Sequence, residues 1–72
     1  MSTNVQIRIV VNGEARSLVE GQTIAQLLGE LDLDPARVAV EMDRRIVKPH
    51  EWAGAVIADG AQLEIVQFVG GG

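Results

Sequence analysis

The chain has 72 residues, which is enough for one domain with a small core and leaves little room for a walled active-site cavity. Hydrophobic residues make up 47% of it, as in a globular domain, and ten acidic against six basic side chains give a formal net charge of −4. This charge argues against a nucleic-acid partner, which would need a basic stripe. The absence of cysteine excludes disulfides, thiolate metal sites, iron–sulfur clusters and a cysteine nucleophile.

The sequence has no targeting or membrane signal that we can identify. Residues 1–4 contain neither a basic n-region nor an apolar h-region, and no apolar run approaches the ~20 residues of a membrane span. We therefore expect a cytoplasmic protein that does not associate with membranes. Its acidic surface would suit a basic protein partner and would equally serve solubility alone.

The first predicted element is a β-strand over residues 5–11, because β-branched apolar side chains alternate there with other residues. Asn12-Gly13 follows and strongly favours a hairpin turn, since both residues tolerate a positive φ. Residues 15–19 should then run back as an antiparallel strand. The buried face of the first strand would consist of Val5, Ile7, Ile9 and Val11.

A helix is predicted next, because apolar residues recur at i, i+3, i+4 and i+7. Thr23 and Gln26 have the spacing of a capping box at its start. Pro35 disfavours a helical conformation at the residue before it, so the helix should not continue far beyond Leu33. The apolar stripe consists of Ile24, Leu27, Leu28 and Leu31.

Strand patterns return in the second half of the chain. A tight turn at Asp43-Arg44 should join a strand over residues 38–42 to a short strand over 45–47. Residues 49–52 suggest a loop or a single helical turn, with Trp52 packed beneath it in a small satellite cluster. A turn at Asp59-Gly60 should precede the last strand, over residues 63–68.

The order ββαβββ is similar to that of the α+β class called β-grasp or ubiquitin-like. This similarity implies a mixed sheet of about four or five strands with one main helix on one face, the first and last strands being parallel neighbours at its centre. Residues 1–69 would form this domain and residues 70–72 a flexible Gly-Gly-Gly tail. We expect a core between helix and sheet that includes Ile7, Ile9, Leu27, Leu28, Val40, Leu63 and Ile65.

Side-chain catalysis has few candidates. His50 is the only histidine, and a metal site would need further ligands beside it. We therefore interpret His50 as a surface residue. No hydroxyl residue has a histidine near it in the sequence, and no glycine-rich phosphate loop precedes a helix. We expect no catalytic side chain, no metal and no bound cofactor.

The glycine tail offers a different kind of chemistry. Gly70, Gly71 and Gly72 directly follow an apolar strand, and without Cβ atoms they could thread a channel closed to other residues. Such a tail presents an α-carboxylate at Gly72, which becomes reactive toward nucleophiles once ATP-dependent adenylation supplies a leaving group. A glycine run can also be a plain linker or a cloning scar, although a scar would usually sit beside a tag or carry serine.

A docking surface can also be predicted. Val10, Val66 and Phe68 alternate away from the expected core although they are apolar. Together they would form an apolar patch on the open face of the sheet, beside the tail, where partners could bind. The alternative is that the protein's own residues cover Phe68.

Nearly the whole chain resembles the ThiS family, the sulfur carrier proteins of thiamine biosynthesis. Two turn positions depart from the family's pattern, which usually has Asn at the position of Asp43 and Asp at that of Ala61. The resemblance rests on Asn12-Gly13-Glu14, Gly21-Gln22-Thr23 before Leu27-Leu28, Val38-Ala39-Val40, Ile46-Val47 with Pro49 and Trp52, Asp59-Gly60, and Leu63-Glu64-Ile65-Val66 leading to Val69-Gly70-Gly71-Gly72.

The resemblance implies a carrier that is a substrate of other enzymes and is not itself an enzyme. An adenylyltransferase of the ubiquitin-activating type would consume ATP to form an acyl-adenylate at Gly72. A sulfur donor protein would convert it to a thiocarboxylate, and thiazole synthase would accept the sulfur.

The sequence is also compatible with other functions. The same chemistry could serve a different acceptor, as in a molybdopterin synthase small subunit or a carrier for cysteine or a siderophore-type product. The chain could also be a protein modifier that forms isopeptide bonds through Gly72, or a binding module with an incidental tail. The sequence specifies neither the sulfur donor nor the oligomeric state.

Overall fold

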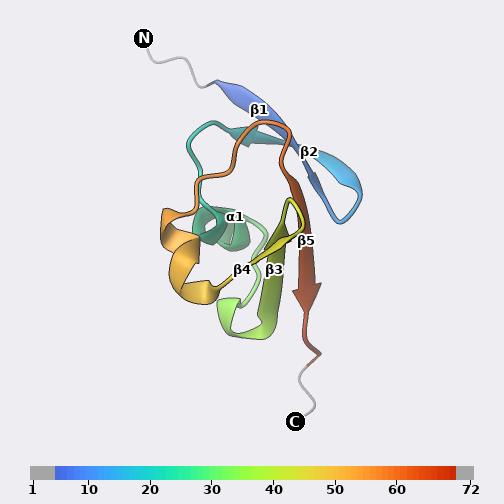
Figure 1. The fold of residues 1–72 in the computed structure, drawn as a ribbon, viewed down its shortest axis with the longest axis vertical. Helices are drawn as coiled ribbons and strands as arrows, with labels where there is room; N and C mark the ends of the chain where they lie inside the picture. The colour runs from blue at the N-terminus through green and yellow to red at the C-terminus, as the bar shows by residue number, and fades with distance from the viewer. Residues whose placement is uncertain (1–4, 70–72) are drawn as a thin grey trace.

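A computed structural model describes residues 5–69, which form a five-stranded mixed sheet with one α-helix against one face (Figure 1). Two short 3-10 helices, η1 and η2, lie in the connections. In chain order the elements are β1 (Gln6–Val11), β2 (Glu14–Val19), α1 (Ile24–Glu30), η1 (Pro35–Arg37), β3 (Val38–Met42), β4 (Arg45–Val47), η2 (Pro49–Gly54) and β5 (Gln62–Gln67).

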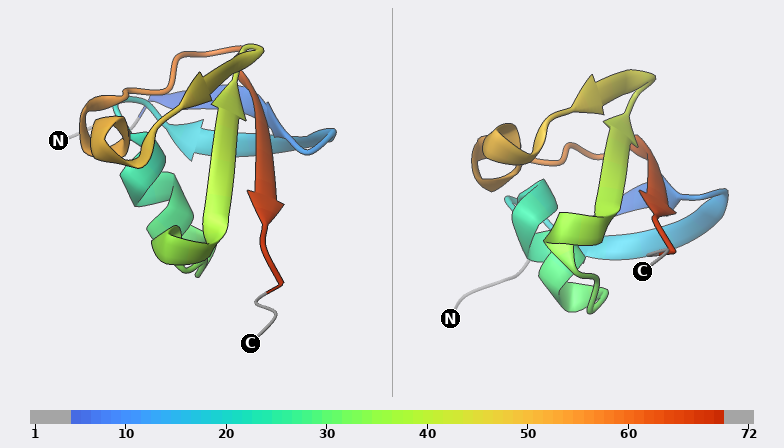
Figure 2. Two further views of the ribbon diagram at one scale, coloured as in Figure 1. Left: turned by 60° about the horizontal axis from the view of Figure 1, so that its bottom comes forward. Right: turned by 90° about the horizontal axis from the view of Figure 1, so that it is seen from below.

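The strand order in the sheet is β2-β1-β5-β3-β4. β1 and β5 pair in parallel, whereas β2 with β1, β3 with β5 and β4 with β3 pair antiparallel. The first and last strands are therefore neighbours at the centre of the sheet, and the predicted β-grasp arrangement is confirmed. Figure 2 shows α1 lying on one side of the curved sheet, with β5 passing through its middle.

Both predicted tight turns are present and require left-handed backbone conformations. Asn12 and Gly13 have φ values of 51° and 83°, and Asp43 and Arg44 have 52° and 69°. Two consecutive positive φ values are the signature of a type I′ turn, whose twist matches that of the strands that it joins. Arg44 has neither the freedom of glycine nor the tolerance of asparagine, so the pairing of β3 with β4 must hold it there.

The helix begins at the predicted capping box. The Thr23 hydroxyl accepts a bond from the Gln26 N–H at 3.2 Å, and the Gln26 side chain accepts one from the Thr23 N–H at 2.8 Å. The helix ends before Leu33, because Asp32 adopts a φ of 58° and interrupts the helical backbone conformation. Leu33 then donates its N–H to Leu28 O at 3.0 Å and Asp32 donates to Gly29 O at 3.1 Å, which is a Schellman motif with aspartate in the position that glycine usually takes.

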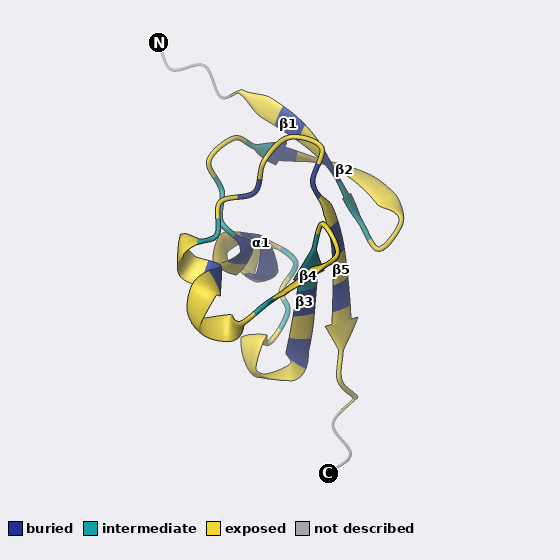
Figure 3. Ribbon diagram, in the orientation of Figure 1, coloured by how far each residue is buried: buried dark blue, intermediate teal, exposed yellow. Residues whose placement is uncertain are grey.

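The core lies between α1 and the inner face of the sheet (Figure 3). All seven predicted core residues are buried, and no polar or charged side chain of the described residues is buried with them. The buried set is Ile7, Ile9, Leu18, Ile24, Leu27, Leu28, Val38, Val40, Trp52, Ile57, Ala61, Leu63 and Ile65.

Two expectations about packing are wrong. Val5 lies just before β1 and is exposed, so the four-residue buried face predicted for this strand shrinks to Ile7 and Ile9, with Val11 half-buried. Trp52 belongs to the main core and not to a satellite cluster, since residues 49–54 form a 3-10 helix that packs against α1. Its indole N–H donates to Val47 O at 2.8 Å, so the ring is buried with its polar atom satisfied.

Candidate functional site

Within residues 5–69 the side chains do not form a catalytic or metal-binding constellation. His50 is exposed on η2, and no group of three or more His, Asp or Glu residues in this part of the chain could hold a metal ion. The Thr23 hydroxyl is used by the capping box, and Ser17 is exposed on β2. The candidate functional features are instead the hydrogen bonds along β5 and the exposed side chains on the outer face of the sheet.

β5 is held along both edges, and its bonds alternate between its two neighbours. On the β3 side, Asp43 donates its N–H to Gln62 O at 2.8 Å, and its carboxylate accepts from the Gln62 N–H at 3.0 Å. At the far end of this edge, Phe68 donates its N–H to Arg37 O at 2.6 Å, one residue beyond the end of β5. The Asp43 carboxylate thus provides the acceptor for the first N–H of β5.

On the β1 side, side chains begin and end the pairing. Asp59 Oδ1 accepts the Arg8 N–H at 2.8 Å where the two strands first meet. Main-chain bonds follow from Val10 N–H to Ala61 O at 3.0 Å and from Asn12 N–H to Leu63 O at 2.9 Å.

The Asn12 side chain then bonds both main-chain groups of Ile65. Its Oδ1 accepts the Ile65 N–H at 2.7 Å, and its Nδ2 donates to Ile65 O at 3.0 Å. Asn12 was predicted only as a turn residue, and nothing in the sequence around it indicates Ile65 as a partner.

The chain leaves the sheet immediately after these contacts. Phe68 and Val69 follow β5, and Val69 is 95% exposed. Gly70, Gly71 and Gly72, the predicted carrier tail, lie outside the described residues. Two residues, Phe68 and Val69, thus separate the central strand of the sheet, which is hydrogen-bonded on both sides, from the three glycines in the sequence.

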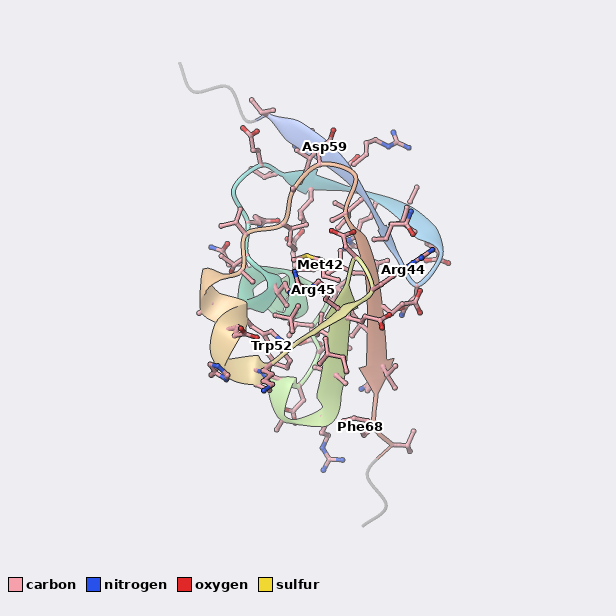
Figure 4. All side chains as sticks on the ribbon, viewed as in Figure 1. Met42, Arg44, Arg45, Trp52, Asp59 and Phe68 are labelled. Atoms are coloured by element: carbon pink, nitrogen blue, oxygen red, sulfur yellow. The ribbon has the colours of Figure 1, made fainter. Side chains whose placement is uncertain are left out.

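The face of the sheet opposite α1 carries an apolar patch across β3, β4 and β5. The strand register places Ala39 opposite Val66 and Ile46 opposite Glu41. Ile46 is 76% exposed, Val66 55% and Phe68 54%. Figure 4 shows Phe68 at the end of β5, next to the point where the chain leaves the sheet. We call Ala39, Ile46, Val66 and Phe68 the outer-face patch.

A shallow hollow of about 320 Å³ lies within this face and contains a carboxylate pair. Its lining includes Ala39, Ile46 and Val66 of the patch, together with Glu41 and Glu64. These two glutamates stand directly opposite each other on β3 and β5. Like charges directly opposite each other on neighbouring strands repel.

The three residues predicted as a docking patch do not all lie together. Val66 and Phe68 lie near each other at the end of β5, whereas Val10 is half-buried on β1 and stands opposite Gln62, four positions before Val66. Ile46 was not predicted, because a three-residue strand gives too little alternation to show which face it occupies.

The fold has solved counterparts. A thiamine biosynthesis protein (ThiS) from Geobacter metallireducens superposes with a TM-score of 0.79 at 25% sequence identity, covering 92% of this chain and all of that one. A solution structure of a thiamine biosynthesis protein from the same organism gives a TM-score of 0.76 at 26% identity, with 92% and 88% of the two chains covered.

Sequence comparison gives the same relationship. The sulfur carrier protein ThiS of Escherichia coli (strain K12) is 33% identical over 66 residues, which are 92% of this chain and 100% of the relative. The thiazole synthase of Paramagnetospirillum magneticum is 44% identical over 66 residues, and that of Magnetococcus marinus is 35% identical. This chain covers 92% of its own length in both matches but spans only a fifth of each thiazole synthase.

Five strands in this order around one helix define a β-grasp domain. A model of the ThiS family matches residues 9–72, most of the chain, and the chain belongs to the ThiS family. Among residues 5–69 no helix has the length and apolar character needed to cross a membrane.

Proposed function

We propose that this chain is a sulfur carrier of thiamine biosynthesis whose reacting group is the α-carboxylate of Gly72. The observation that carries the proposal is the match to the ThiS family, which extends through the three glycines to residue 72. The sulfur carrier protein ThiS of Escherichia coli (strain K12), which this chain covers over its full length, supports the same proposal.

The proposed reaction has two steps on the carrier. A carboxylate oxygen of Gly72 attacks the α-phosphorus of ATP on an adenylyltransferase of the ubiquitin-activating type, and pyrophosphate leaves. Hydrosulfide supplied by a sulfur donor protein then adds to the acyl carbon and AMP leaves, which gives the thiocarboxylate. ATP is consumed by the partner, and the carrier itself needs no bound cofactor.

Thiazole synthase is the acceptor that the comparisons favour. Two proteins named thiazole synthase contain a stretch similar to this chain in about a fifth of their length. A carrier joined to its acceptor in one polypeptide delivers its sulfur at a high effective concentration. We infer that this chain serves the same kind of acceptor.

The outer-face patch is the proposed docking surface for both partners. Its exposed apolar side chains adjoin the end of β5, so a partner that covers them would also lie next to the point where the chain leaves the sheet. The Glu41–Glu64 pair adds a requirement, because a lysine or arginine of the partner placed between the two carboxylates would relieve their repulsion. We therefore expect a partner surface that is apolar with a basic group at its centre.

A reconstituted reaction tests the proposal. The chain is incubated with ATP, its cognate adenylyltransferase and a sulfur source, and the products are analysed by intact mass. Adenylation and then exchange of oxygen for sulfur are expected. A variant that lacks Gly72 and a variant with one added residue after it should both fold and fail, since the reacting carbon is displaced from its near-attack position. Reaction of either variant at the rate of the unaltered chain would contradict the proposal.

A further inference from the structure

Asn12 has a second function beyond its turn. In a parallel pair of strands, a residue donates its N–H to one residue of the neighbouring strand, and its C=O accepts from the residue two positions further along. Asn12 donates its N–H to Leu63 O, so the Asn12 C=O and the N–H of residue 14 would be the next partners for Ile65. The hairpin prevents this, because β1 turns away at Asn12 with a φ of 51°.

The Asn12 carboxamide replaces both missing main-chain groups. Oδ1 takes the position of the acceptor and Nδ2 that of the donor, with distances to Ile65 of 2.7 and 3.0 Å. The pairing of β5 with β1 is thereby extended by one residue beyond the end of β1. Without it, the pairing on this edge would end at the bond from the Asn12 N–H to Leu63 O.

This extension lies where the chain approaches the tail. On the opposite edge the last contact is Phe68 to Arg37 O, and η1, which contains Arg37, is capped by Asp34. β5 is thus held from both sides up to the residues that precede the tail: by Asn12 at Ile65 and by Arg37 at Phe68. If only the β3 edge held it, the end of β5 could twist away from the sheet plane and take the tail with it.

We propose that Asn12 is a positioning residue for the reaction of Gly72, acting through Ile65 to fix the direction in which β5 delivers the tail to the partner. The proposal depends on the proposed function. It does not involve the outer-face patch, so loss of the carboxamide should affect the reaction of a docked carrier and not its docking.

The test uses Asn12→Gly, because glycine also accepts the positive φ of this turn while lacking the carboxamide. Amide hydrogen exchange should become about tenfold faster at Ile65. The Val10 amide, which bonds Ala61 O on the same pair of strands, is the internal control and should be unchanged. Steady-state adenylation should show kcat lowered about 10- to 100-fold at an unchanged KM for the carrier, as expected from a misplaced reacting group.

A second variant separates positioning from general destabilisation. Ile24→Val, in the core at the start of α1, loses one buried methylene and removes none of the hydrogen bonds made by Ile65 and Phe68. At a comparable lowering of Tm it should keep the kcat of the unaltered chain. An Asn12→Gly variant with faster exchange at Ile65 and unchanged kcat would overturn the positioning function, as would an effect confined to KM or an equal loss of kcat in Ile24→Val. Failure of the unaltered chain to be adenylated at Gly72 would overturn the proposed function and this inference with it.

Discussion

Leu28 shows how much of the stability depends on single side chains. It is 2% exposed and lies where α1 meets the sheet, in a domain whose core comprises few residues. Leu28→Ala should lower the free energy of unfolding by ~2–5 kcal/mol, because a cavity is added to the lost burial. Urea unfolding followed by circular dichroism measures this, and the exposed Glu30→Ala on the same helix should change stability by less than ~0.5 kcal/mol. A similar loss in both variants would contradict the assigned packing of α1.

For single residues, the sequence predicted the burial of apolar side chains better than the hydrogen-bond partners of polar ones. Burial of Leu28 follows from local periodicity, which depends on neighbours in the chain. The bonds of Asn12 depend on Ile65, and those of Asp43 on Gln62, partners that only the folded sheet brings near. The left-handed conformation of Asp32 is equally hard to foresee, since glycine is the usual residue there.

The outer-face patch spans β3, β4 and β5, and two valines of similar exposure allow a matched test of it. Val66 in the patch is 55% exposed, and Val56, outside it in the connection to β5, is 58% exposed. Val66→Asp should weaken binding of both the adenylyltransferase and thiazole synthase at least about tenfold, as loss of an interface anchor does. Val56→Asp should leave both affinities unchanged.

Phe68→Asp should act in the same direction as Val66→Asp. Because Phe68 is half-exposed, the Tm of this variant should stay close to that of the unaltered chain. Titration calorimetry and thermal unfolding provide the two measurements. Unchanged affinity of both patch variants would exclude this face as the docking surface.

For the carboxylate pair between β3 and β5, we predict a substitution that stabilises the isolated domain. Glu64→Gln removes the repulsion from Glu41 and should stabilise the isolated domain by ~0.2–1 kcal/mol. It should also slow association with a basic partner and reduce the dependence of that rate on salt. Glu20→Gln, at an exposed turn, is the control for net charge and should do neither to the same extent. Faster association of Glu64→Gln would contradict a basic group opposite the pair.

At the scale of elements, the sequence predicted which segments form strands but not how they align. Val10 and Val66 were grouped because both alternate away from the core. The parallel register instead sets Val10 opposite Gln62, near the start of β5, and so separates it from Val66. Ile46 joins the patch because β4 pairs it with Glu41, a relation that its own three-residue strand does not encode.

The architecture of the whole molecule could be predicted because each local signal favoured the same fold. The two type I′ turns, the capping box and the apolar central strands each specify one connection or one layer. A sequence folds well when its local preferences agree with the overall fold, and the same agreement makes the fold predictable from the sequence. The position of β5 at the centre of the sheet, up to its end at Gln67, follows from the same topology.

The most direct test of the central claim is the intact mass of this protein isolated from cells that make thiamine. We predict a fraction whose mass exceeds that of the unmodified chain by the difference between sulfur and oxygen, with fragmentation mapping the change to the carboxyl group of Gly72. That fraction should disappear when the adenylyltransferase is absent. A modification mapped to any other residue, or a lysine conjugate formed through Gly72 in place of the thiocarboxylate, would contradict the account.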